Sequence, residues 1–243
     1  MYCPHTVFRE TWASRHLSIE TFEKILSAAS RTKLMYLQGW GEPFMNPDFF
    51  AMVEMAKKAG RRVGVTTNGM LLDDDIISRL VEQHVDIVAF SLAGADEMND
   101  TFRKGTRLET VLSAIRNLNH KKEASKSSRP AIHIAHMLLR SALDSLEKLP
   151  QLLEDTGVAQ VVISTLDFVP TEEFEGEVLA PRTMDEYENL RARLDAVASE
   201  ARLRNIDVHY LIRYPGERRP VCTENILRAL FISAGGEVSP CVF

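Results

Sequence analysis

Hydrophobic positions along the chain fall into two alternating patterns. Short, almost wholly apolar runs predict buried strands, and they recur at 34–38, 62–66, 86–91, 131–138, 160–165 and 206–212. Longer stretches with apolar residues at helical spacing precede and separate them, at 19–30, 48–59, 73–83, 108–122, 145–155 and 184–204. Apolar strands that alternate with helices are typical of a parallel sheet covered by helices. The pattern therefore predicts an α/β fold.

The alternation ends after residue 212, where a stretch rich in turn residues, 213–220, predicts a linker. Beyond it, the segments 230–233 and 235–238 predict a β-hairpin around a turn at the glycine pair Gly235-Gly236. We therefore expect one unit over 1–212 and the start of another over 213–243.

Three loops that follow predicted strands carry unusual residues. In parallel α/β folds the ligand site forms beyond the carboxyl ends of the strands. The loops there read Gln38-Gly39-Trp40-Gly41-Glu42-Pro43, Thr66-Thr67-Asn68-Gly69 and Ser91-Leu92-Ala93-Gly94. Glycines let a backbone approach a ligand closely, while Glu42 and Ser91 supply an acceptor and a donor for a polar, zwitterionic group. Arg103 adds a contact for a carboxylate.

Each loop taken alone also fits an ordinary explanation. Gly41 and Gly69 are common turn residues, Asn68 precedes a turn glycine, and Glu42 fits a solvated surface position. Three such loops in succession at one end of the sheet favour a binding site over three independent turns.

Composition and charge narrow the class of protein. The 243 residues are 45% hydrophobic and 26% charged, which excludes disorder, and the net charge of −5 gives no electrostatic reason to bind nucleic acid or an anionic membrane. No apolar run is long enough for a bilayer, and the first residues lack the pattern of a signal peptide. Three cysteines cannot form a disulfide framework and fit a reducing compartment. We expect a cytoplasmic enzyme.

The three loops resemble motifs of the radical S-adenosylmethionine (radical SAM) family. Residues 40–43 look like its GGEP motif with Trp40 in the first glycine position, while 66–69 and 91–94 look like its TTNG and SLDG elements. The resemblance covers the chain from Tyr2 to about Thr165. It implies a partial (β/α)6 TIM-like barrel, here without its first strand. It also implies reductive cleavage of SAM by a [4Fe-4S] cluster to a 5′-deoxyadenosyl radical.

The resemblance is incomplete at the cluster loop, CxxxCxxC. Cys3 matches the third cysteine, and Tyr2 matches the aromatic residue that commonly precedes it near the adenine. The first two cysteines have no counterpart, because only Met1 and Tyr2 come before Cys3. Two explanations stay open: the chain starts late, or the protein has lost its cluster.

The resemblance also implies roles for individual residues. The Gly41 backbone and Glu42 would hold the methionyl amino group of SAM, and Ser91 with Arg103 would hold its carboxylate. Weaker candidates to line the ribose or adenine, or to face the same cavity, are Thr67, Asn68, Leu166 and His136. A lone histidine on an apolar strand is more often a core residue. No catalytic side chain is implied.

The tail carries a second resemblance, to the opening of the SPASM extension, CX9-15GX4C. Cys222, Gly236 and Cys241 fit this spacing, which implies metal ligands for an auxiliary [4Fe-4S] cluster. The alternative is that both cysteines are small buried residues. The further SPASM cysteines have no counterpart, so the chain is expected to end early.

SPASM members modify peptides, proteins or cofactors, so the resemblance implies such a substrate and an electron donor such as flavodoxin or ferredoxin. Residues 2–17 are also similar to maturases of tungsten-dependent oxidoreductases. A cluster-less barrel that acts as a scaffold or binds a partner is the main alternative. A barrel hydrolase or aldolase that uses Glu42 and a metal is weaker, because histidines and carboxylates do not cluster at metal-ligand spacing.

Overall fold

Six parallel strands form one sheet, in the same order as they occur along the chain. The computed structural model describes residues 3–11, 14–166, 168–169, 171–216 and 228–241. The strands are β1 (Leu34–Tyr36), β2 (Arg62–Thr67), β3 (Ile87–Leu92), β4 (Ala131–Leu138), β5 (Val158–Thr165) and β6 (Asp207–Tyr210). All six apolar runs thus form the predicted strands, and stepwise parallel order is the arrangement of a (β/α) barrel.

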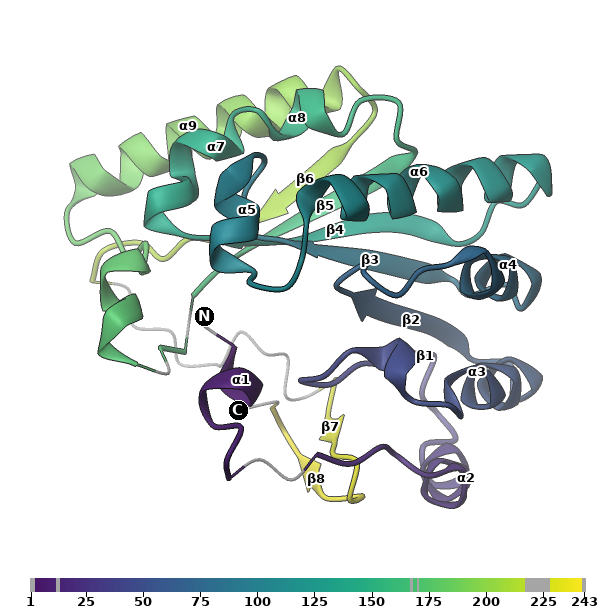
Figure 1. The fold of residues 1–243 in the computed structure, drawn as a ribbon. Helices are drawn as coiled ribbons and strands as arrows, with labels where there is room; N and C mark the ends of the chain where they lie inside the picture. The colour runs from purple at the N-terminus through teal and green to yellow at the C-terminus, as the bar shows by residue number, and fades with distance from the viewer. Residues whose placement is uncertain (1–2, 12–13, 167, 170, 217–227, 242–243) are drawn as a thin grey trace.

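Helices follow most of the strands, and most of the helices lie along the outer side of the curved sheet (Figure 1). They are α1 (Pro4–Val7), α2 (Ile19–Ala28), α3 (Phe49–Lys58), α4 (Asp74–Glu82), α5 (Glu97–Phe102), α6 (Leu108–Ala124), α7 (Leu143–Leu146), α8 (Leu149–Leu152) and α9 (Met184–Arg202), with 3-10 turns η1 (Pro43–Met45), η2 (Arg140–Ala142) and η3 (Glu172–Glu177). Within the described ranges, no helix combines the length and the apolar character that crossing a membrane requires.

The predicted single helix at 145–155 is wrong. Two short helices, α7 and α8, occupy the region, and Pro150 lies in the first turn of α8. Proline lacks the N–H that an interior helical position donates, so it is tolerated only at a helix start and divides the segment. Helix α5 is an element that the hydrophobic pattern did not predict. Its start is capped by Asp96, whose side chain accepts a hydrogen bond from the Met98 backbone N–H at 3.1 Å.

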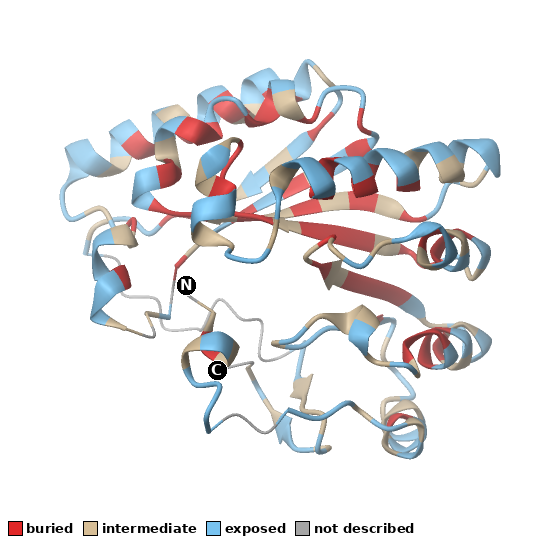
Figure 2. Cartoon of the chain, viewed as in Figure 1, coloured by how far each residue is buried: buried red, intermediate tan, exposed pale blue. Residues whose placement is uncertain are grey.

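The strand register divides the sheet into two faces, because paired residues of parallel strands point to the same side. The outer face meets the helices and forms the core (Figure 2). Its strand residues include Val63, Val65, Val88, Phe90, Ile132 and Ile134. The inner face carries the alternating residues. One level of it holds Thr66, Ala89, His133, Gln160 and Asp207, and the next level towards the carboxyl ends holds Ser91, Ala135, Val162 and His209.

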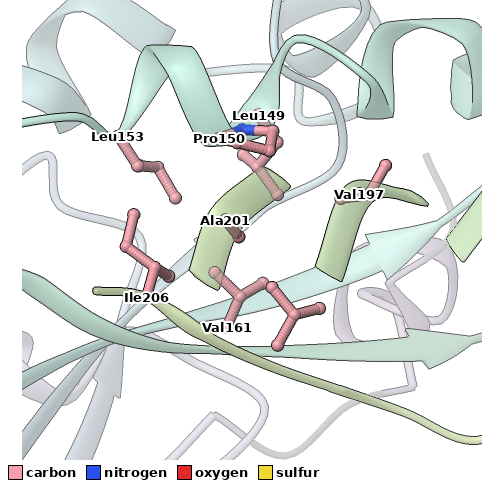
Figure 3. Close-up of a pocket in the computed structure, with 8 residues that line it drawn as sticks. Leu149, Pro150, Leu153, Val161, Val197, Ala201 and Ile206 are labelled. Atoms are coloured by element: carbon pink, nitrogen blue, oxygen red, sulfur yellow. The ribbon is translucent and has the colours of Figure 1, made fainter. Parts of the chain in front are cut away.

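Packing between the last two strands and the helices above them is wholly apolar. Figure 3 shows the small pocket there, between α8, α9 and the strands β5 and β6. It is lined by Leu149, Pro150, Leu153, Val161, Val197, Ala201, Ile206 and Val208. These side chains offer no polar anchor for a ligand, so the pocket belongs to the core.

A buried carboxylate with partly exposed cationic partners joins the amino ends of the central strands. The Asp86 side chain is 2% exposed, lies 2.7 Å from the Lys57 ammonium and 3.1 Å from the Arg129 guanidinium, and accepts the Val63 backbone N–H at 2.9 Å. One carboxylate thereby ties α3, β2 and the segment before β4 to the start of β3. In (β/α) barrels this amino-terminal end of the sheet serves stability.

The predicted hairpin is present as β7 (Phe231–Ile232) and β8 (Val238–Ser239), which pair antiparallel. Gly236 has a φ of +88°, a conformation that glycine adopts at little cost, and a side chain there would meet Thr21 of α2. The turn of the hairpin therefore packs against α2. The proposed boundary at residue 212 stays a prediction, because 217–227 lie outside the described residues.

Candidate functional site

Glu42 follows β1 and is held by two groups from the loop after β2. Its Oε1 accepts a hydrogen bond from the Thr67 hydroxyl at 2.7 Å, and its Oε2 accepts one from the Asn68 backbone N–H at 2.9 Å. Because each oxygen has its own donor, the carboxylate plane is fixed relative to the edge of the sheet. The structure thus brings together the first two loops that the sequence singled out.

Burial raises the pKa of Glu42 above its ordinary value, against the opposing effects of the hydrogen bonds from Asn68, Thr67 and the Phe44 backbone and of the Arg103 charge. Neutral donors and one nearby cation therefore leave the carboxylate incompletely compensated. A ligand ammonium beside Glu42 would supply the missing positive charge. On this observation, the amino group of a zwitterionic ligand fits the site.

The loop after β2 is built to present these donors. Thr67 is 1% exposed, and its hydroxyl also accepts the Gly69 backbone N–H at 3.0 Å. The Asn68 side-chain oxygen accepts the Met70 N–H at 2.8 Å, so it stabilises the loop itself. Gly69 has a φ of +79°, and a Cβ there would lie 3.3 Å from both Phe90 and Val111. A glycine is therefore required for the loop to turn here.

Arg103 immediately follows α5 and brings positive charge to the same edge. Its backbone N–H bonds to the Asn99 carbonyl at 2.8 Å, and its own carbonyl accepts the Thr106 hydroxyl at 2.7 Å. The fully buried Asn99 anchors the helix, because its side-chain oxygen accepts the Ala93 N–H at 3.0 Å. The charge of Arg103 acts on the site, because it lowers the pKa of Glu42 and of His136.

Ser91 and Gly41 occupy positions that suit their predicted roles. Ser91 is half-buried on the inner face of β3, beside the loop that leads into α5. Gly41 is exposed, and a Cβ added to it would meet no atom within 4 Å, so the backbone of its loop is open to a ligand. Their contacts with SAM stay predictions.

The predicted cluster ligands are only partly described. Cys3 lies directly before α1, Cys241 lies two residues after β8, and both cysteines are half-buried. Tyr2 and Cys222 lie outside the described residues. In the part of the chain that the structure describes, no three His, Cys, Asp or Glu side chains gather as metal ligands do. The described residues thus give one thiol for each predicted cluster, fewer than an iron–sulfur cluster requires, and do not by themselves fit one.

His136 does not face the cavity that its place near the end of β4 suggested. It pairs with Leu92 and Ile163 and is 1% exposed, on the side of the sheet that the helices cover. Neither ring nitrogen has a hydrogen-bond partner in the structure. Burial, together with the charge of Arg103, lowers the pKa of His136 to about 4. The ring is therefore neutral at pH 7 and belongs to the core.

Protonation of His136 should contribute to the loss of stability in acid. Its native pKa of about 4 lies below the ordinary value of 6.5, so the unfolded chain binds the proton first, and stability falls as the pH drops from 6.5 to about 4. The shift corresponds to about 3 kcal/mol over that window. In urea unfolding at a series of pH values, His136→Leu should lose this component and should be more stable than the wild type at pH 7, because unpartnered buried nitrogens are costly.

The matched control is His120→Gln, because His120 is exposed on α6. This variant should keep the acid sensitivity of the wild type. Identical pH profiles for His136→Leu and the wild type would contradict the assignment of the acid sensitivity to His136.

Sequence reasoning missed two residues that organise the site. Thr67 was expected to line the ligand, yet it holds Glu42, which lies 25 positions earlier. Asn99 was not singled out, and it anchors the helix before Arg103. A single sequence carries no signal for either contact, since both depend on how neighbouring loops meet.

Known proteins with a similar sequence belong to the family whose motifs the three loops resemble. The sequence model of the radical SAM superfamily matches residues 1–126, just over half of the chain. A tungsten-containing aldehyde ferredoxin oxidoreductase cofactor-modifying protein from Pyrococcus furiosus is 30% identical over 165 residues. That match covers 65% of this chain and 46% of the relative. Mycofactocin maturase MftC from Mycobacterium ulcerans is 31% identical over 104 residues, or 42% of this chain and 28% of the relative.

Two solved structures share the fold. SuiB from Streptococcus suis, bound to S-adenosylmethionine, gives a TM-score of 0.67 at 12% identity, over 95% of this chain and 54% of SuiB. The native anSMEcpe structure with bound AdoMet gives a TM-score of 0.68 at 18% identity, over 94% of this chain and 67% of that chain. The chain spans less than half the length of the two curated relatives above.

Proposed function

The chain belongs to the radical SAM superfamily, and on that premise we propose that it forms the SAM-binding part of an enzyme for peptide, protein or cofactor maturation. The proposed reaction is the reductive cleavage of SAM to methionine and a 5′-deoxyadenosyl radical. A [4Fe-4S] cluster, for which Cys3 is our candidate ligand, would supply the electron for that cleavage. The names of the relatives, a cofactor-modifying protein and a mycofactocin maturase, support the choice of substrate class.

The fixed carboxylate of Glu42 is the observation that carries this proposal. Thr67 and Asn68 orient it, and the charge of Arg103 lies close by. A carboxylate and a guanidinium at the same edge of the sheet match the ammonium and the carboxylate of a free amino acid end, such as the methionyl group of SAM. Glu42 would bind the ammonium while Arg103 and Ser91 bind the carboxylate, which fixes the orientation of the methionyl group.

The open backbone of Gly41 supports the same arrangement. Because no atom occupies the space where its side chain would be, the methionyl group can approach the loop next to Glu42. We propose that Gly41 contributes its backbone, and that Asn68 contributes through the loop it stabilises and the N–H it donates to Glu42. Tyr2 is proposed to pack near the adenine, and Cys222 and Cys241 to hold an auxiliary [4Fe-4S] cluster.

The full-length gene product tests the proposal. After anaerobic reconstitution with iron and sulfide, and with dithionite or a flavodoxin or ferredoxin system as reductant, the protein should bind SAM and form 5′-deoxyadenosine, measured by liquid chromatography. Folded protein that binds SAM without cleaving it would support the cluster-less scaffold instead. Folded protein that fails to bind SAM would contradict the assignment of the site.

A further inference from the structure

Two histidines and one glutamine lie on the inner face of the sheet, on three neighbouring strands. His133 lies on β4, Gln160 beside it on β5, and His209 on β6, one level nearer the carboxyl ends. Strand alternation places all three on the face opposite the helices. His133 and Gln160 are half-buried and His209 is exposed, so the group is open to a ligand. Burial, with a smaller effect of the His209 charge, lowers the pKa of His133.

This group lies beside the candidate SAM site. The register aligns Ser91, Ala135, Val162 and His209 across four neighbouring strands. His133 lies one level deeper, about 7 Å further from the carboxyl ends, since each residue of a strand advances about 3.3 Å. The residues between Ser91 and the two histidines include Ala89 and Ala135, whose small side chains leave room above the sheet.

The available donors favour one kind of ligand. Two imidazoles and a primary amide offer several N–H donors, and protonation of either ring adds a positive charge. The two histidines repel each other when both are charged, and an anion placed between them would remove that cost. Neither level of the inner face carries Lys or Arg, so the site suits a singly charged carboxylate better than a phosphate dianion.

We infer that His133, Gln160 and His209 bind a carboxylate group of the substrate next to the SAM site. The binding of a carboxylate stands on the geometry of this face, and the assignment of that carboxylate to the substrate rests on the proposed function. The other titratable group of the neighbouring strands on this face is Asp207, which pairs with Gln160 and is exposed.

Histidine NMR on the 243-residue chain tests the inference without SAM, iron or activity. The chain has seven histidines, so ¹³Cε1 labelling gives seven signals that His→Gln variants can assign. The probe is N-acetylglycine, and N-acetylglycinamide is the matched control that lacks only the negative charge. Titrations are run at constant ionic strength.

N-acetylglycine should raise the apparent pKa of His133, against the lowering that burial causes, and should shift the ¹³Cε1 signal of His209. When its concentration is about ten times the Kd of the protonated pair, linkage predicts a rise of about one pH unit. The exposed His120 should not respond. His209→Gln should raise the pKa of His133 in the absence of the probe, because the like charge is gone, and should weaken the probe effect. Asp207→Asn should retain the probe effect.

Equal responses to the acid and the amide, or no response of folded protein at saturating probe, would overturn the inference. Such a result would leave the proposed function intact, because SAM cleavage is measured separately. Conversely, the histidine signals could respond to N-acetylglycine in a protein that never cleaves SAM. That result would support the carboxylate site and reject its assignment to the substrate of this reaction.

Discussion

Glu42→Gln should weaken SAM binding by about a hundredfold, or about 2.7 kcal/mol, because it removes the charge that faces the methionyl ammonium. The variant should still fold. The glutamine oxygen can accept the Asn68 N–H, and its amide can donate to the Thr67 hydroxyl, so both contacts of Glu42 have a replacement. Neutralising a half-buried carboxylate also removes a burial cost, so urea unfolding should show no loss of stability. Equilibrium dialysis with labelled SAM on the reconstituted full-length protein measures the affinity.

Thr67→Val is the informative companion to Glu42→Gln. It keeps the charge of Glu42 but removes one of the two donors that orient it, so SAM affinity should fall by about tenfold, near the value of one hydrogen bond to a charged group. The pH dependence separates the two variants. Burial raises the pKa of Glu42, so wild-type and Thr67→Val binding should decline on acidification, whereas Glu42→Gln should lack this decline. A Glu42→Gln protein with wild-type affinity would contradict the assignment of Glu42 to the ammonium.

Asp86→Asn should lower the free energy of unfolding by about 3 kcal/mol, because it leaves the ammonium of Lys57 and the guanidinium of Arg129 without their shared carboxylate. Asparagine is nearly the same size and can still accept the Val63 N–H, so the loss reports charge pairing rather than packing. Urea unfolding at pH 7 measures the change. SAM affinity of the folded protein should stay unchanged, since Asp86 lies at the amino ends of the strands and the candidate site lies at the carboxyl ends.

The pH dependence of Asp86→Asn has a defined sign. Burial opposes ionisation of Asp86, but the hydrogen bonds from Lys57 and Val63 and the charges of Lys57 and Arg129 together lower its pKa below the ordinary value. Its contribution is therefore present above the unfolded pKa, about 3.9, and is lost as the pH falls through the native pKa. The difference between wild type and variant should disappear in strong acid.

The exposed pair Glu20 and Lys24 provides a matched control for Asp86. Its atoms are also 2.7 Å apart, but the two side chains are 78% and 73% exposed. Glu20→Gln should change the stability little, because solvent screens an exposed ion pair. Equal effects of Asp86→Asn and Glu20→Gln would contradict the structural role of the Asp86 cluster.

Several features followed directly from local sequence. Apolar runs marked all six strands, since a strand covered by helices excludes charged side chains along most of its length. The three loops were recognisable because Gly69, Glu42 and Ser91 stand at or shortly after the ends of such runs, and parallel strands carry their ligand sites there. The single helix predicted at 145–155 is wrong because Pro150 divides the segment, and this proline is visible in the sequence.

A single sequence does not show which side chains contact each other. The order of strands and helices, the residue types at the carboxyl ends and the radical SAM resemblance could all be predicted from the amino-acid order, and the family match confirms the resemblance. The folded chain was needed to show that Thr67 holds Glu42, that His136 lies in the core, and that His133 and His209 share the inner face. Side chains of a strand alternate between its two faces, and which face is inside depends on the register with the neighbouring strands.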